Sequence, residues 1–272
     1  MQTSLAAIKT ALSLALTVAA SLAASDRAGD LLITPVRLQL DDRSRSGSLV
    51  VANLSPRALR YRINVVDMEM LADGTLRRLD HDAENSAKAL LRISPREVAL
   101  APGASQTIRV LATPGSDRGE FRSHLEFQPI SRAGAPVTTT AANGPGLQVN
   151  FDVKFVVTIP VIASFGPVTT SAKLSNGSVH ADRGRWTANL VINRTGTGTV
   201  RGDLVAVFHS MNGKALQVAK MTGLPVYYPT AARTITLPLS KDLSTLGKGE
   251  LEITYAIEPR RPLSKLEIPV GG

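Results

Sequence analysis

GLQVNFDVKFVVTIP, residues 146–160, is the stretch that determines how the chain folds. Every second residue in it is apolar: Leu147, Val149, Phe151, Val153, Phe155, Val157 and Ile159. Strict alternation predicts a β-strand with one apolar face. At about 3.3 Å per residue, the roughly fourteen residues up to Pro160 would reach about 46 Å, whereas ordinary strands span about 17–20 Å. The strand is about twice as long as a sandwich needs, so the surplus calls for a function.

The chain before this stretch also has the pattern of short strands. We expect strands at Leu31–Leu40, Ser48–Asn53, Leu59–Met70, Leu91–Pro95, Glu97–Leu100, Ser105–Ala112 and Gly119–Gln128. Pro35 places the first strand at an edge or a bulge, because proline cannot donate to a ladder. Asp73-Gly74 is a hairpin signal, and residues 131–146 form a loop without periodicity.

After Pro160 the strand pattern starts again. We expect strands at Val168–Leu174, Trp186–Asn193, Gly202–His209, Ala215–Lys220, Ala232–Leu239, Glu250–Ile257 and Leu263–Val270. About seven short strands with regular turn signals are typical of an immunoglobulin-like β-sandwich. The sequence therefore predicts an all-β protein of two such domains, residues 26–161 and residues 162–272.

Residues 1–25 have the pattern of a cleavable signal peptide. Lys9 precedes the apolar run Ala11–Ala20, and small residues follow, so we expect cleavage between Ala23 and Asp26. The run is short for a membrane span, and we expect no span in the mature chain. The formal charge of +9 is spread over scattered basic residues, and no aromatic side chains lie among them to stack on bases. Because we also expect the chain to be exported, nucleic acid is not an expected partner. The absence of cysteine excludes disulfides and thiolate metal sites.

No set of residues predicts catalysis. His81-Asp-Ala-Glu84 brings three potential metal ligands together, but in a polar, solvated loop. His124 alternates with Arg122 and Glu126, and we expect it at the surface or at the rim between sheets. Arg201-Gly-Asp203 matches a cell-attachment tripeptide but falls at the start of a strand. There is no nucleophile elbow and no glycine-rich phosphate loop, so we expect a protein that is not an enzyme and that has no metal and no cofactor.

Several segments together resemble one family. They are Leu91-Arg-Ile-Ser-Pro95, Val98-Ala-Leu-Ala-Pro-Gly103, Gln106–Leu111, Gly119–Phe127 and the alternating strand ending at Pro160. In this order and spacing they resemble residues of the periplasmic (PapD-like) chaperones of the chaperone–usher pathway, which assemble pili and fimbriae. The resemblance covers residues 30–160. It implies two immunoglobulin-like domains set at an angle, a periplasmic location, and pilus or fimbrial subunits and an outer-membrane usher as partners.

The resemblance also implies a mechanism that uses the surplus strand. Family members lend the last strand of the first domain to a subunit that lacks one, in donor-strand complementation. Here the lent side chains would be Leu147, Val149, Phe151 and Val153. Phe155, Val157 and Ile159 would lie in the core of the chain's own domain. A free apolar edge needs protection, so a self-capping homodimer is a further expectation.

Two cations of the family hold the terminal carboxylate of the subunit. Arg37 matches the first by position, and a guanidinium can bind a carboxylate with two hydrogen bonds. Lys154 is the candidate for the second, one residue from the place that counting back from Pro160 gives, and Arg122 is the substitute candidate. Family members often link the domains with an arginine before the final proline. Ile159 stands at that place, so the resemblance implies a domain junction held in another way and a divergent subclass.

A rival hypothesis shares the fold. A secreted two-domain sandwich for adhesion or glycan binding would have the same export signal and would bind through its loops. Usher and subunit genes beside the gene for this chain would favour the chaperone. A solute-binding or enzymatic role is the third hypothesis, and no polar constellation in the sequence supports it.

Overall fold

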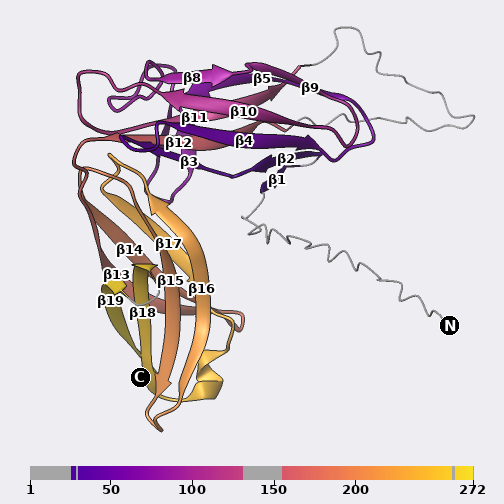
Figure 1. Cartoon of the computed structure of the whole chain (residues 1–272). Helices are drawn as coiled ribbons and strands as arrows, with labels where there is room; N and C mark the ends of the chain where they lie inside the picture. Colours follow the sequence, from indigo (N-terminus) through magenta and orange to yellow (C-terminus); the bar gives the residue numbers. More distant parts are fainter. Residues whose placement is uncertain (1–25, 29, 131–154, 259–260, 272) are drawn as a thin grey trace, which may run out of the picture.

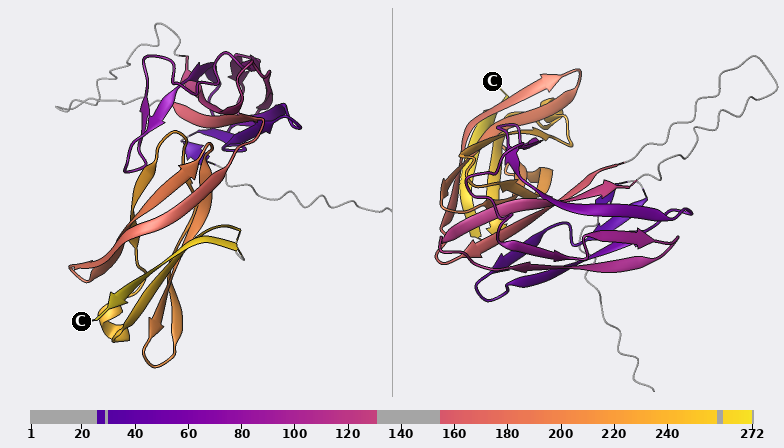
Figure 2. Two further views of the ribbon diagram at one scale, coloured as in Figure 1. Left: turned by 90° about the vertical axis from the view of Figure 1, so that its left-hand side faces the viewer. Right: turned by 90° about the horizontal axis from the view of Figure 1, so that it is seen from above.

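The computed structural model of the 272-residue chain describes residues 26–28, 30–130, 155–258 and 261–271. These residues form two β-sandwiches, and the strands of the first run across those of the second (Figures 1 and 2). The regular structure described is β-strand apart from one 3₁₀ helix, η1 (Leu243–Leu246). Among the described residues, no helix is long and apolar enough to cross a membrane.

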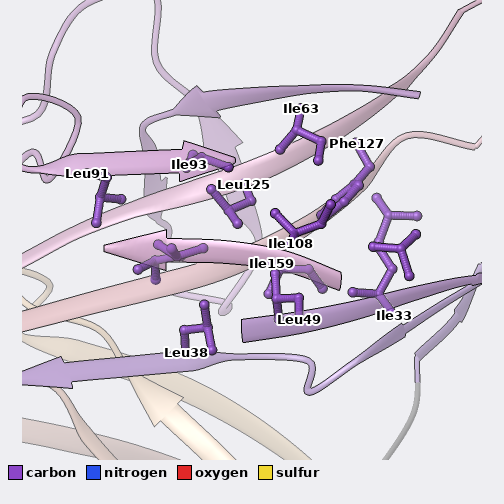
Figure 3. Close-up of a cluster of buried hydrophobic side chains, with 14 of the residues drawn as sticks. Ile33, Leu38, Leu49, Ile63, Leu91, Ile93, Ile108, Leu125, Phe127 and Ile159 are labelled. Atoms are coloured by element: carbon purple, nitrogen blue, oxygen red, sulfur yellow. The ribbon is translucent and has the colours of Figure 1, made fainter. Parts of the chain in front are cut away.

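The first sandwich packs two sheets of five described strands face to face. One sheet has the order β1 (Asp26–Ala28), β2 (Leu31–Thr34), β4 (Ser46–Asn53), β10 (Ser105–Ala112), β8 (Leu91–Ser94). The other has the order β3 (Leu38–Asp41), β12 (Val157–Phe165), β11 (Gly119–Pro129), β5 (Leu59–Val66), β9 (Glu97–Leu100). Alternate residues such as Leu49, Ile63, Ile108 and Phe127 point between the sheets and form the core (Figure 3), as period-two patterning requires.

The strand expected at 31–40 is two strands in different sheets. β2 pairs with β4, whereas β3 pairs in parallel with β12. Residues 35–37 carry the chain across the edge of the sandwich. Pro35 lacks the N–H that a continuous ladder needs, so the break falls where the proline stands. Arg37 is the last residue of this crossing, directly before β3 begins at Leu38.

β12 continues beyond the proline at which we expected the strand to end. Pro160 lies opposite His124 of β11, and β12 then runs on to Phe165, which is fully buried in the first core. We therefore propose that the chain divides into domains after Phe165 instead of after residue 161. At the other end of the strand, Val157 and Ile159 are buried as expected, but Phe155 is 51% exposed. The expectation that Phe155 lies in the core was wrong.

The second sandwich contains a strand for each of the seven segments that the sequence predicted. One sheet has the order β13 (Thr170–Asp182), β14 (Arg185–Gly196), β17 (Ala232–Pro238), and the other β16 (Ala215–Val226), β15 (Val200–Ser210), β18 (Gly249–Glu258), β19 (Arg261–Val270). A separate cluster of buried aliphatic and aromatic side chains fills the space between them. Each sandwich therefore has a core of its own.

A small hairpin connects the two sandwiches. β6 (Met68–Met70) pairs with β7 (Leu76–Arg78), and the turn contains Asp73-Gly74 as predicted. Gly74 has a φ of +87°, a conformation that suits glycine. The hairpin reaches the second sandwich, where the Thr234 amide donates to the Ala72 carbonyl at 2.6 Å. The Thr230 hydroxyl donates to the Met70 carbonyl at 3.0 Å.

Candidate partner-binding site at the domain junction

The outer face of β11 carries polar side chains, and it is covered. Arg122 and Glu126 are buried, and His124 has no exposed area. The expectation that His124 lies at the surface or the rim was wrong. Alternation identified which residues share the face. It did not show that Arg78 of the β6–β7 hairpin donates a hydrogen bond to Glu126, or that Tyr227 of the second sandwich stacks on Arg122. The sequence pattern of one strand does not contain these long-range contacts.

Glu120 joins the two sandwiches through hydrogen bonds. Its side chain is only 6% exposed, and its carboxylate accepts from the Thr199 amide at 2.8 Å and from the Thr199 hydroxyl. The hydroxyl oxygen of Thr199 in turn accepts a hydrogen bond from the Tyr228 amide at 3.1 Å. Hydrogen bonds to a carboxylate are stronger than neutral ones. This contact therefore fixes the beginning of β15 against β11.

Arg122 is enclosed at the junction. Its Nη2 donates to the Met68 carbonyl at 2.9 Å, and its guanidinium carbon lies 4.4 Å from the centroid of the Tyr227 ring. That distance is within the range of a cation–π contact. Its Nε and Nη1 have no hydrogen-bond partner among the described residues. Burial lowers the pKa of Arg122.

His124 packs against the same tyrosine. The two ring centroids are 6.4 Å apart with the rings nearly perpendicular, an arrangement that aromatic pairs favour. Burial, followed by the positive charge of Arg122, lowers the pKa of His124 to about 3. The imidazole is therefore neutral at neutral pH and contributes no charge to the junction.

Arg194 of β14 fixes the loop that carries Tyr227. Its guanidinium donates to the Thr230 carbonyl at 2.8 Å, to the Gly196 carbonyl at 2.7 Å and to the Pro229 carbonyl at 3.3 Å. It also lies 5.2 Å from the centroid of the Tyr228 ring. A planar guanidinium with several fixed acceptors is a rigid brace. This brace sets where the Tyr227 ring meets the first sandwich.

Arg37 stands at the same junction and is partly exposed. Burial, followed by the positive charge of Arg201, lowers the pKa of Arg37, and Tyr227 acts in the opposite direction. Among the described residues, no carboxylate lies within 4 Å of its guanidinium. Arg37 thus lies in the field of another cation and has no carboxylate partner among the described residues.

The other expected site residues fall into two groups. Arg122 has the contacts described above and faces Tyr227. Lys154 lies outside the described residues, as do the four expected donor side chains, Leu147, Val149, Phe151 and Val153. The sequence reasoning missed Glu120, Thr199, Tyr227 and Arg194. The dipeptide Tyr227-Tyr228, which holds two of only four tyrosines in the chain, was the available signal for Tyr227.

The remaining sequence candidates form no site in the described part of the chain. His81 bonds to the exposed Asp80 at 2.8 Å, and the described residues contain no group of three or more metal-ligating side chains. The tripeptide Arg201-Gly-Asp203 lies within β15. The Asp203 carboxylate accepts from the Gly223 amide at 2.7 Å, so its role is to hold a strand pair.

Comparisons with known proteins give structural matches. No protein-family model matches the sequence. A search of curated proteins finds no match either. Among solved structures, the chain is similar to one described as a chaperone–tip adhesin complex for CFA/I fimbriae biogenesis, with a TM-score of 0.47 and 13% identity, covering 89% of this chain and 98% of the other. It is similar to the class 5 fimbriae chaperone CfaA, with a TM-score of 0.46 and 16% identity, covering 88% and 98%.

A third match is the chaperone–tip subunit pre-assembly complex CsuC–CsuE from the archaic chaperone–usher Csu pili of Acinetobacter baumannii. Its TM-score is 0.46 at 11% identity, and the alignment covers 89% of this chain and 99% of the other. At these identities the likeness is one of fold. The three alignments cover 88–89% of this chain and 98–99% of the matched chains.

Proposed function

We propose that the chain is an exported periplasmic chaperone that binds pilus or fimbrial subunits by lending them a strand and delivers them to an outer-membrane usher. The lent side chains are Leu147, Val149, Phe151 and Val153, and Arg37 holds the terminal carboxylate of the subunit. Residues 1–25 direct export and are removed. The chaperone acts without catalysis and without a cofactor.

One observation carries this proposal: within the described residues, the apolar side chains of the alternating run pass from buried to exposed. Val157 is 5% and Ile159 1% exposed, whereas Phe155, two residues before Val157 in the same alternation, is 51% exposed. Phe155 and the adjacent Val156 are both more than half exposed, and contiguous exposed apolar residues mark sites of interaction. The run continues the same alternation back to Leu147. An extended segment with one apolar face fits strand addition to an incomplete sheet.

The free energy gained by burying the four lent side chains is large enough to stabilise a subunit. Burying a large apolar side chain contributes about 1.5–3 kcal/mol, so four contribute on the order of 6–12 kcal/mol before the costs of ordering both partners. A neighbouring subunit whose strand fits better could then replace the chaperone. Transfer by exchange of strands needs no nucleotide.

Arg37 is our candidate for the carboxylate anchor because of its place and its charge environment. It lies at the crossing between the two sheets, near the second sandwich, without a described carboxylate within 4 Å. Lys154 stays a candidate for a second cation. Arg122 is enclosed by Tyr227 and the Met68 carbonyl, so we assign it to the domain junction.

Co-expression with candidate subunits tests the proposal. The quantity to measure is the soluble subunit that co-purifies with wild-type chaperone, with Arg37→Ala, with Phe151→Asp and with Arg109→Ala. Arg109 is exposed on β10, far from the junction in the sheet order, and is the matched control for loss of one positive charge. We expect wild type and Arg109→Ala to recover subunit. We expect the other two to recover at least tenfold less while remaining folded, because one loses the anchor and the other places a charge in an apolar groove.

Normal recovery of subunit with Phe151→Asp would contradict the lent strand. Normal recovery with Arg37→Ala would contradict the anchor alone. Failure of the wild-type chain to bind any subunit, together with binding of a glycan or surface protein through its loops, would favour the rival adhesion hypothesis. Ultracentrifugation of the free protein tests the self-capping homodimer, which should dissociate when Phe151 carries a charge.

A further inference from the structure

The end of the second sandwich that lies away from the first is built from three connections between strands. They are the β13–β14 turn, the β15–β16 turn and the segment from β17 to β18 that contains η1 (Figure 1). The Trp186 indole donates to the Asp242 carboxylate at 2.8 Å, and the Met211 amide donates to the Lys248 carbonyl at 3.2 Å. These bonds join the three connections into one surface. We call it the distal end, and it consists of residues 182–185, 211–214 and 239–248.

Basic side chains outnumber acidic ones on the distal end. Two residues, Asp182 and Asp242, are acidic, and the next acid along the chain, Glu250, belongs to β18. The basic residues are all exposed and are Arg183, Arg185, Lys214, Lys241 and Lys248. Among the described residues, no carboxylate lies within 4 Å of any of them. The Asp242 carboxylate accepts from the indole of Trp186 and from the amide and hydroxyl of Ser244, so the distal end keeps an excess of positive charge.

Arg183 occupies a position that does not suit its backbone. Arg183 and Gly184 form the two-residue turn between the paired residues Asp182 and Arg185, and their φ angles are +47° and +77°. Turns with two positive φ angles favour Asn, Asp or Gly at the first position, because other side chains strain the backbone there. Turn chemistry therefore does not explain the arginine. A charge presented at the tip of the hairpin does.

An apolar side chain lies exposed beside these charges. Met211 is 79% exposed, the highest value of any large apolar side chain in the described part of the chain. Lys214 follows in the same turn, and Leu216, near the start of β16, is 39% exposed. Exposed apolar side chains next to basic ones combine a group that can leave water with cations that attract a negatively charged layer.

We propose that the distal end docks on the surface of a membrane that contains anionic lipids. The basic side chains lie among the lipid phosphates, and Met211 inserts between the headgroups. Each basic residue near such a surface strengthens binding about fivefold, so a few of them suffice for reversible docking. This inference goes beyond the proposed function and does not depend on it.

A lipid surface suits the distal end better than a shaped acidic protein does. Recognition of an acidic protein relies on cations held in a defined geometry toward fixed carboxylates. Lipid headgroups move sideways, so they can meet charges that come from three separate connections. A bilayer also accepts an apolar side chain such as Met211 below the headgroups.

Vesicle binding by the purified protein, in its exported form, tests this inference. Vesicles of one part phosphatidylglycerol to two parts phosphatidylcholine are compared with vesicles of phosphatidylcholine alone, and co-sedimentation gives the partition coefficient. The variants are Lys214→Gln with Lys248→Gln, Met211→Ser, and the control Lys173→Gln with Lys220→Gln. Lys173 and Lys220 are exposed within β13 and β16 of the same sandwich, so the control loses the same charge outside the distal end.

We expect wild type and the control to bind the anionic vesicles nearly equally and to ignore the neutral ones. The double variant at Lys214 and Lys248 should bind about tenfold more weakly or less, because it lacks two cations at the surface. Met211→Ser should bind about threefold more weakly, because it loses the inserting side chain. Added salt should weaken binding of wild type, because it screens exposed charges.

Trp186 reports which surface meets the membrane. It is the only tryptophan of the chain, and it bonds to Asp242 at the distal end. A lipid with a nitroxide on its headgroup should therefore quench the fluorescence of the protein on anionic vesicles. Bound protein with unquenched Trp186 would show that another surface holds the membrane, and it would overturn the inference.

Equal binding by wild type and the double variant at Lys214 and Lys248 would also overturn the inference, as would the absence of binding to anionic vesicles. If wild type ignored those vesicles but bound hexaglutamate, and the double variant lost this binding, the distal end would be a surface for an acidic protein and the lipid inference would fall. The double variant should recover subunit normally in co-expression, so failure of either proposal leaves the other intact.

Discussion

His124 is fully buried at the junction, and neither of its ring nitrogens has a hydrogen-bond partner among the described residues. Its near neighbours are Arg122 on its own strand and Tyr227 from the second sandwich, and Asp67 also contributes to its charge environment. A neutral imidazole suits this place, because a second positive charge beside Arg122 would be unfavourable. Burying two unpaired ring nitrogens destabilises the folded state, and the packing of the imidazole against Tyr227 offsets this.

The lowered pKa of His124 predicts a dependence of stability on pH. Below pH 6.5 the unfolded chain binds a proton at His124 that the folded chain does not bind until about pH 3. The free energy of unfolding is therefore highest, as far as His124 is concerned, above pH 6.5. Between pH 6.5 and about pH 3 it falls by up to about 1.4 kcal/mol per pH unit. His124→Phe removes this loss. In urea unfolding at pH 8, 6 and 5, the variant should gain stability relative to wild type at each step down.

A difference between the two proteins that stays constant from pH 8 to pH 5 would contradict the neutral buried state of His124. The carboxylates titrate in both proteins, so their contribution cancels in the comparison. The value at pH 8 gives the effect of the ring substitution alone.

Strand β12 shows at the scale of an element how one alternating pattern serves two purposes. Ile159 is 1% exposed in the first core, and Phe155 is 51% exposed. Ile159→Ala should cost about 2–5 kcal/mol of unfolding free energy, because it leaves a cavity among packed side chains. Phe155→Ser should change it by no more than about 0.5 kcal/mol, as for other surface substitutions. Chemical denaturation of the two variants measures both.

Similar losses for the two variants would mean that Phe155 packs in the core in solution. That result would remove the observation on which the proposed function rests. Phe155 stands two residues before β12 and continues the alternation of Ile159, so each position is a control for the other.

The strands themselves could be predicted from the sequence, because alternation and turn residues are local signals. The segments expected at 105–112 and 119–128 agree with β10 and β11 to within a residue. The effect of a proline on where a strand ends was less predictable. Pro35 breaks a strand between two sheets, whereas Pro160 lies within β12, just before that strand begins to pair with β3 at Val161. The same residue type has opposite effects because the neighbouring strands differ.

The candidate site was predictable only in part, for a similar reason. Arg37 could be selected by its position in a resembling segment. The contacts of Arg122 and Glu120 join residues about 80 to 105 positions apart in the sequence, so no local pattern contains them. The described contacts of Glu120, Arg122 and the β6–β7 hairpin show which residues join the two sandwiches.

The molecule as a whole depends on the junction between its two sandwiches. Thr199→Val removes a hydroxyl donor from the buried Glu120 carboxylate and leaves that group with one fewer partner. We expect a loss of about 1–3 kcal/mol and a wider range of domain orientations. Calorimetry and small-angle X-ray scattering measure the two effects. Thr107→Val, at an exposed position of β10, should have neither, and identical behaviour of the two variants would contradict the role of this contact.

Amide hydrogen exchange of residues 147–153 tests the lent strand most directly. The measurement compares the free protein with a purified complex of the protein and a subunit. We predict strong protection of this segment in the complex, because its backbone N–H groups would pair with the subunit sheet. A stable complex in which residues 147–153 exchange as fast as in the free protein would contradict the central claim.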